Sequence, residues 1–92
     1  MAERRATIAS RVGLHARPAS IFAEAAAAQP LEVTIALDGE PADEAMDASS
    51  MLALMSLGAS NGDVVVLRAE GEGAEEALDA LVKILETDLD AQ

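Results

Sequence analysis

The alternation between strand-like and helix-like hydrophobic patterns within only 92 residues is the feature that most constrains the fold. Apolar residues recur at every second position in some segments, as in a half-buried strand, and at helical spacing in others. In chain order, the patterns predict a strand over 6–9, a helix over 16–28, a strand over 31–37, a weaker strand over 40–44, a helix over 50–57, a strand over 63–69 and a helix from residue 74 onward. A chain of this length can build a single core, so we expect one domain over residues 1–92.

Two of the predicted helices carry a clear apolar stripe. The stripes are Ala19, Phe22, Ala23 and Ala26 in the first helix, and Ala77, Leu78, Leu81, Val82 and Leu85 in the last. A four-stranded sheet with the helices on one face would bury both stripes together with the apolar side of each strand. We therefore expect an α+β fold of this kind. The pattern leaves the order of the strands in the sheet open.

Turn and cap signals place the ends of the middle elements. The dipeptide Asp38-Gly39 is a strong hairpin signal. Pro41 in the returning segment lacks an N–H, so we expect an edge strand or a distorted strand there. The short helix over 50–57 is closed by Gly58 and preceded by several N-cap candidates. The candidates are Asp47, Ser49 and Ser50.

The charge balance argues against several classes of partner. The formal net charge is −11, with 6 basic residues against 17 acidic ones, and Phe22 is the single aromatic residue. Nucleic-acid binding depends on Lys and Arg that neutralise phosphates and on rings that stack on bases. Anionic membranes attract positive charge in the same way. We therefore expect no nucleic-acid partner and no membrane partner.

The absence of cysteine excludes disulfides, thiol catalysis and zinc–thiolate sites. With a single histidine as well, the chain has a poor ligand set for a metal. The charged N-terminus is not followed by the apolar stretch of a signal peptide. These features predict a cytoplasmic protein that holds no metal.

The strongest chemical signal is the only histidine, His15, which stands just before a predicted helix with Pro18 in its first turn. A helix N-terminus leaves several backbone N–H groups unpaired and carries about half a positive charge, so it forms an anion site. Arg17 adds a guanidinium that can hold phosphate oxygens in a fork. A neutral imidazole at this place is a nucleophile, and the positive helix end disfavours its protonated form.

Each of these residues also has a purely structural interpretation. A lone histidine can be a capping or surface residue without chemistry, and Arg17 can be a surface cation. In either case, Gly13 suits the loop before the helix and Pro18 suits the first turn of the helix. The residues around His15 therefore leave both interpretations open.

Two segments resemble a known family. The run Gly13-Leu14-His15-Ala16-Arg17-Pro18-Ala19 resembles the active-site motif of HPr, the histidine phosphocarrier of the phosphoenolpyruvate-dependent sugar phosphotransferase system. The run Ser50-Met51-Leu52-Ala53-Leu54-Met55-Ser56-Leu57-Gly58-Ala59 resembles the regulatory-site helix of that family and the loop after it. The two motifs occur in the right order and at the right spacing, and the resemblance covers essentially the whole chain.

The resemblance implies a fold, a chemistry and a set of partners. The fold would be an open-faced β-sandwich, an antiparallel four-stranded sheet with three helices on one side. His15 would accept a phosphoryl group on Nδ1 from phosphorylated Enzyme I and pass it to a histidine of an Enzyme IIA domain. Ala16 and Arg17 would support the phosphate. The protein would act as a monomeric carrier rather than an enzyme, without a cofactor.

Ser50 aligns with the serine that an ATP-dependent kinase phosphorylates in many Gram-positive relatives. A serine kinase/phosphorylase and a transcription regulator would then be further partners. This chain departs from the family here, because Ser49 stands where a lysine is common and Ala53 where a glycine is common. The alternative interpretation of Ser50 is a simple N-cap.

The resemblance also implies a docking surface that several partners share, and methionine suits such a surface because it adapts to different shapes. The docking residues would be Ser20, Met51, Leu52 and Met55. The alternative is that some of these apolar side chains only pack the short helix against the core.

Two other classes of function compete with a carrier. The first is a regulatory binder in which Ser50 is the switch and a transcription factor is the partner. The intact motif around His15 argues against it, because a pure regulator needs no phosphorylatable histidine. The second is a hydrolase or metal enzyme, but no motif places a second acid or base near His15.

Overall fold

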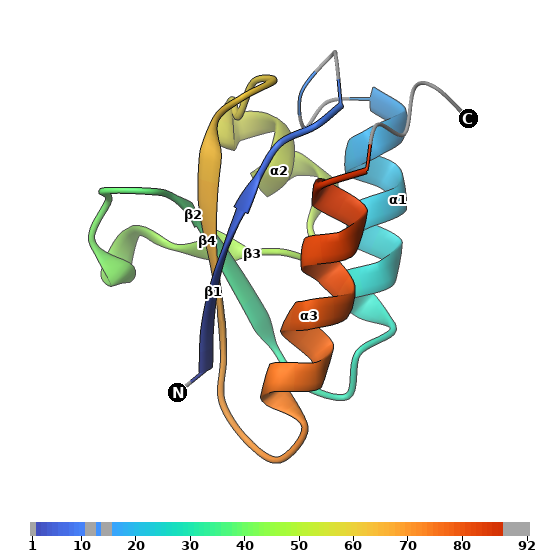
Figure 1. The fold of residues 1–92 in the computed structure, drawn as a ribbon, viewed down its shortest axis with the longest axis vertical. Helices are drawn as coiled ribbons and strands as arrows, with labels where there is room; N and C mark the ends of the chain where they lie inside the picture. Colours follow the sequence, from blue (N-terminus) through green and yellow to red (C-terminus); the bar gives the residue numbers. More distant parts are fainter. Residues whose placement is uncertain (1, 11–12, 14–15, 88–92) are drawn as a thin grey trace.

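The computed structural model describes residues 2–10, 13 and 16–87. Its elements follow the predicted order, with a short 3-10 helix added (Figure 1). They are β1 (Ala2–Thr7), α1 (Ala16–Ala27), β2 (Val33–Leu37), the 3-10 helix η1 (Ala42–Glu44), β3 (Met46–Asp47), α2 (Met51–Leu57), β4 (Val64–Ala69) and α3 (Ala74–Leu85). The predictions for the three α-helices are confirmed to within a residue or two at each compared end.

The four strands form one antiparallel sheet in the order β1-β4-β2-β3. Along β4, Val64 lies opposite Thr7 of β1, and Ala69 lies opposite both Ala2 of β1 and Val33 of β2. All three α-helices lie on the same side of this sheet (Figure 1). The predicted open-faced α+β sandwich is therefore confirmed, and the structure supplies the strand order that the sequence left open.

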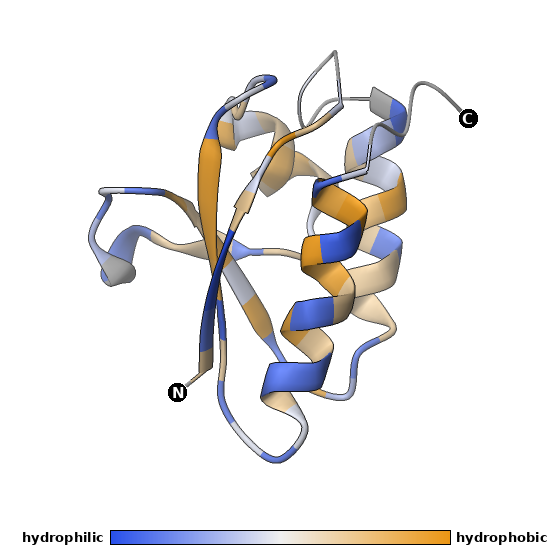
Figure 2. Ribbon diagram, in the orientation of Figure 1, coloured by the Kyte–Doolittle hydropathy of each residue, from blue (hydrophilic) through white to orange (hydrophobic). Residues whose placement is uncertain are grey.

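The core lies between the helices and one face of the sheet. Alternate strand residues point into it, and β4 contributes Val65, Leu67 and Ala69. Phe22 and Leu78 meet them from α1 and α3, and both side chains are fully buried. Figure 2 shows apolar and polar residues alternating around α3, as an amphipathic helix on a sheet requires.

The first strand differs from its prediction over 6–9, because β1 spans Ala2–Thr7 and includes the charged residues at positions 3–5. A strand tolerates these charges because successive side chains point to opposite faces. Arg4 points toward α3, where its Nε lies 3.0 Å from Asp79 Oδ1. Glu3 is on the other face, 3.4 Å from Arg68 Nε.

The bounds predicted for the returning strand, 40–44, are wrong, although the strand does lie at the edge of the sheet. Those residues form a turn and η1, and β3 pairs with Thr34 and Ile35 of β2 only at Met46 and Asp47. The Leu37 N–H, which a strand returning at once would use, donates instead to the Glu40 carboxylate at 3.1 Å. Pro41 has no N–H to offer in return. The connection between β2 and β3 is therefore long, and β3 pairs with β2 only after η1.

Candidate functional site

The predicted chemistry centres on the N-terminal end of α1. His15 lies outside the described residues, and Ala16 is described only as the first residue of α1. Arg17 is exposed in the first turn, whereas Pro18 beside it is buried. The histidine therefore directly precedes the first helical residue in the sequence, as predicted.

The electrostatics of this helix end favour an anion. No acidic residue occupies the first turn of α1, although the chain contains 17 of them. The first turn of α3 shows the contrast, since it carries Glu75 and Glu76. Carboxylates in a first turn would compete with a bound anion for the unpaired N–H groups and the helix dipole. The first turn of α1 holds no such competing carboxylate, and Arg17 adds a guanidinium there.

Gly13 fixes the chain two residues before His15. It is buried and has φ +74°, and its N–H donates to the Ser10 carbonyl at 3.0 Å. A Cβ atom at this position would lie 2.4 Å from the Ala59 carbonyl oxygen and 2.9 Å from Ser60 Cα. Only glycine allows this approach, so the backbone of Gly13 packs directly on the loop that follows α2.

The short helix α2 contacts α1 and has a well-defined start and end. Ser50 is its N-cap, and the Ser50 hydroxyl accepts the Ala53 N–H at 3.2 Å. Gly58 ends the helix in the left-handed conformation. Leu54 and Leu57 are buried and anchor the helix to the core. The N-cap interpretation of Ser50 is thus confirmed, and it leaves the predicted regulatory role untested.

The opposite side of α2 carries three apolar side chains that the core does not cover. Met51, Leu52 and Met55 are 38%, 78% and 40% exposed, and they are the exposed large hydrophobic residues of the described part of the chain. We call these three residues the α2 patch. Ser20, the fourth predicted docking residue, lies half-buried in α1. Exposed apolar side chains gathered on one face of a helix are the feature that the predicted docking surface requires.

The turn before α2 holds a hydrogen-bonded carboxylate. Asp47 Oδ1 accepts the Ser49 hydroxyl at 2.7 Å and the Ser49 N–H at 2.9 Å. These two bonds, the hydroxyl bond first, lower the pKa of Asp47 from its ordinary value. They also fix the turn that leads into the Ser50 cap.

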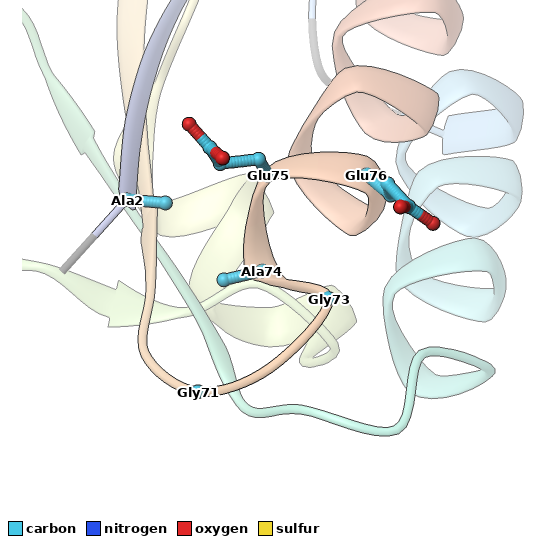
Figure 3. Close-up of a pocket in the computed structure, with 6 residues that line it drawn as sticks. All are labelled: Ala2, Gly71, Gly73, Ala74, Glu75 and Glu76. Carbon is cyan, nitrogen blue, oxygen red and sulfur yellow. The ribbon is translucent and has the colours of Figure 1, made fainter.

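A surface hollow at the other end of the molecule is a poor alternative site (Figure 3). It lies at the start of α3, while α1 begins at the opposite end of the fold (Figure 1). Its lining residues are Ala2, Gly71, Gly73, Ala74, Glu75 and Glu76. Glu75 and Glu76 diverge from each other, and none of the predicted site residues is among the six.

The described residues offer no metal centre and no membrane span. Within these ranges, no group of three or more His, Cys, Asp or Glu side chains could hold a metal ion. None of the helices in the same ranges has the length and apolar character that crossing a membrane requires.

The structure shows one contact close to Gly13 that the sequence did not predict. The Asn61 side-chain amide donates to the carbonyl oxygens of Ala9 and Ser10, which precede Gly13 in the chain. An asparagine in a turn has many possible partners, so the sequence held no signal for this particular contact.

Comparison with known proteins gives a consistent result. The family described as the PTS HPr component phosphorylation site matches residues 2–87. A phosphocarrier protein HPr from Streptomyces coelicolor is 51% identical over 86 residues, which is 92% of this chain and 88% of the relative. A phosphocarrier protein HPr from Haloferax volcanii is 45% identical over 85 residues, which is 92% of this chain and 93% of the relative.

Solved structures show the same fold. The crystal structure of a phosphocarrier protein HPr from Bacillus anthracis superposes with a TM-score of 0.81 at 32% sequence identity. The superposition covers 91% of this chain and 95% of that one. The similarity therefore extends over the sheet and the helices alike.

Proposed function

The chain belongs to the HPr family, the phosphocarriers of the phosphotransferase system, and from that premise we propose that His15 receives a phosphoryl group from phosphorylated Enzyme I and passes it to a histidine of an Enzyme IIA domain. One observation carries the proposal most directly. The helix that starts immediately after His15 has a first turn with Arg17 and without any carboxylate. Such a helix end stabilises three phosphoryl oxygens next to an imidazole.

In the proposed transfer, Nδ1 of the neutral His15 imidazole attacks phosphorus. A phosphorus–nitrogen bond forms to His15 while the bond to the donor atom on Enzyme I breaks and the electron pair leaves with that donor. In the second step, a histidine nitrogen of Enzyme IIA attacks the same phosphorus. The bond from phosphorus to Nδ1 of His15 breaks, and its electron pair stays on His15. The N–H groups at the start of α1, including those of Ala16 and Arg17, and the Arg17 guanidinium take up the charge of the phosphoryl oxygens.

The strength of this site suits a carrier. Each interaction of a surface anion with a helix end contributes only about 0.3–1 kcal/mol. A carrier has to gain its phosphate from one protein and lose it to another, so a much tighter site would trap the group. The positive helix end also disfavours the imidazolium, which keeps the attacking nitrogen unprotonated.

The α2 patch and Ser20 would form the surface on which Enzyme I and Enzyme IIA dock in turn. The support is geometric, because α2 contacts α1 and the loop after α2 packs on Gly13, two residues before His15. Methionine side chains adapt to different partner shapes, which one surface serving two partners requires. We further propose that the chain works as a cytoplasmic monomer with residues 1–92 forming one domain.

We also propose Ser50 as a regulatory phosphorylation site for a serine kinase/phosphorylase, with a transcription regulator as reader of the modified form. A phosphate on the Ser50 oxygen would keep an acceptor near the Ala53 N–H that the hydroxyl now caps. It would also add about two negative charges beside the α2 patch and so weaken docking on an acidic surface. Ser49 and Ala53 differ from the family pattern at this site, so incubation with ATP and the kinase is the deciding test. An unlabelled Ser50 would rule out this switch.

The carrier function is tested with phosphoenolpyruvate and Enzyme I. We expect one acid-labile phosphate per chain, and none on the His15→Ala variant. The His15 assignment is overturned by a His15→Ala variant that still takes up the phosphate. Transfer onward is tested by adding Enzyme IIA, which should remove the label from the wild-type chain.

A further inference from the structure

We propose that Asn61 is a positioning residue for phosphoryl transfer. Its side-chain amide fixes the backbone from which the chain enters the segment containing His15. This inference rests on the proposed function, since it concerns the placement of the phosphorylated histidine. Asn61 itself lies in the turn between α2 and β4, distant in sequence from His15.

The Asn61 amide makes an unusual set of contacts for an exposed side chain. Its Nδ2 lies 3.0 Å from the Ala9 carbonyl oxygen, 3.2 Å from that of Ser10 and 3.4 Å from that of Ile8. The amide has two N–H groups, so three consecutive carbonyls share two hydrogens. One side chain thereby holds the direction of three successive peptide groups after the end of β1.

Backbone hydrogen bonds hold the same stretch from the same turn. The Gly62 N–H donates to the Ile8 carbonyl, and the Ile8 N–H donates to the Asp63 carbonyl, both at 2.9 Å. Beyond residue 10, Gly13 packs against Ala59 and Ser60. Residues 59–63 therefore contact the chain at residues 8–10 and again at 13. His15 follows the second contact by two residues and precedes α1 by one.

Position matters strongly for this reaction, because an in-line transfer requires the nucleophile and the phosphorus in near-attack geometry. A displacement of about 1 Å can reduce a rate about 100-fold. The backbone bonds from Gly62 and Asp63 reach only Ile8. Farther along, the Ala9 N–H donates to the Leu85 carbonyl at 2.9 Å and the Ser10 carbonyl also accepts from Gly13, so the Asn61 amide is what joins its own turn to the carbonyls of Ala9 and Ser10.

Two variants test the proposal, Asn61→Ala and Asn61→Asp. The first removes the donor, and the second keeps the shape but puts a carboxylate against three carbonyl oxygens. We measure kcat and KM for each variant as phosphoryl acceptor from phosphorylated Enzyme I, under conditions in which urea titration shows it folded. We expect kcat to fall about 5- to 50-fold. KM should stay within about twofold, because the α2 patch is untouched.

Gln29→Ala is the matched control. The Gln29 amide also donates to a backbone carbonyl, that of Ala25 at 3.3 Å, but at the far end of α1. This variant should keep the wild-type kcat. Wild-type kcat in both Asn61 variants would overturn the positioning role, and so would a loss confined to KM. Should either variant not fold, Asn61→Gln, which keeps an uncharged amide but moves it by one methylene group, makes the same comparison. Failure of the proposed function would look different, since the wild-type chain itself would then take up no phosphate.

Discussion

At the scale of single residues, the backbone at Gly13 accepts only glycine without strain. Gly13→Ala puts a Cβ atom 2.4 Å from the Ala59 carbonyl oxygen and forces a non-glycine residue to φ +74°. We expect the free energy of unfolding to fall by about 2–5 kcal/mol, which combines left-handed strain with overpacking. Urea unfolding followed by circular dichroism measures it.

Gly39→Ala separates the two causes. Gly39 has φ +97°, but a Cβ atom there meets nothing within 4 Å. Strain alone should cost about 1–2 kcal/mol at this position. Equal losses in the two variants would show that the close approach of Gly13 to Ala59 contributes nothing to stability.

The Asp47 carboxylate gives a residue-scale prediction about pH. In Ser49→Ala, the Asp47 pKa should rise toward its ordinary value of 3.8, because the hydroxyl bond is the main cause of its depression. A depressed carboxyl pKa adds stability above the unfolded pKa, and this stability is lost as pH falls through the folded value. Wild type should therefore exceed the variant in stability near neutral pH and lose this advantage in acid. NMR titration of the Asp47 carboxyl carbon measures the shift, and an unchanged pKa would contradict it.

At the scale of elements, one face of α2 contributes to stability and the other face is the proposed docking surface. Its buried side chains, Leu54 and Leu57, hold the helix, whereas Leu52 is 78% exposed. Leu52→Gln should leave the free energy of unfolding within about 0.5 kcal/mol of wild type. It should weaken binding to Enzyme I by about 1–3 kcal/mol, as expected for an apolar residue at the centre of an interface.

Isothermal titration calorimetry measures that affinity, with Ala80→Gln as the control. Ala80 is exposed on α3, outside the α2 patch, and its replacement should leave the affinity unchanged. If Leu52→Gln bound Enzyme I as tightly as wild type, the α2 patch would not be the docking surface.

The sequence predicted elements well where one hydrophobic period dominates, as at α1 and α3. It failed at β1, where Arg4 and Arg5 obscure the alternation, because their ion pairs with Asp79 and Asp38 come from other elements. It failed again at 40–44, because the Glu40 side chain occupies the Leu37 N–H. The site motif was readable as a local run before α1. The contact of Asn61 could not be predicted, because its partners lie more than 50 positions away in the chain.

At the scale of the whole molecule, the arginines that the structure describes serve two purposes. Arg4, Arg5 and Arg68 each pair with a carboxylate of the sheet, its loops or α3. Within the described ranges, no such ion pair is found for Arg17, which stands at the start of α1. On an acidic molecule, the start of α1 thus keeps its positive charge, directly after the proposed phosphorylation site in the sequence.

The net charge of −11 predicts that salt stabilises the protein. Repulsion among the acidic residues opposes the compact state, and raising the salt concentration shortens the screening length from about 10 Å at 0.1 M to about 3 Å at 1 M. The surface ion pairs of Arg4 and Arg5 weaken too, but such pairs contribute little. We therefore expect Tm to rise with NaCl over this range in calorimetry. The rise should be smaller in Glu70→Gln/Glu72→Gln, which removes two exposed charges outside the helices. A Tm that falls with salt would mean that ion pairs outweigh the repulsion.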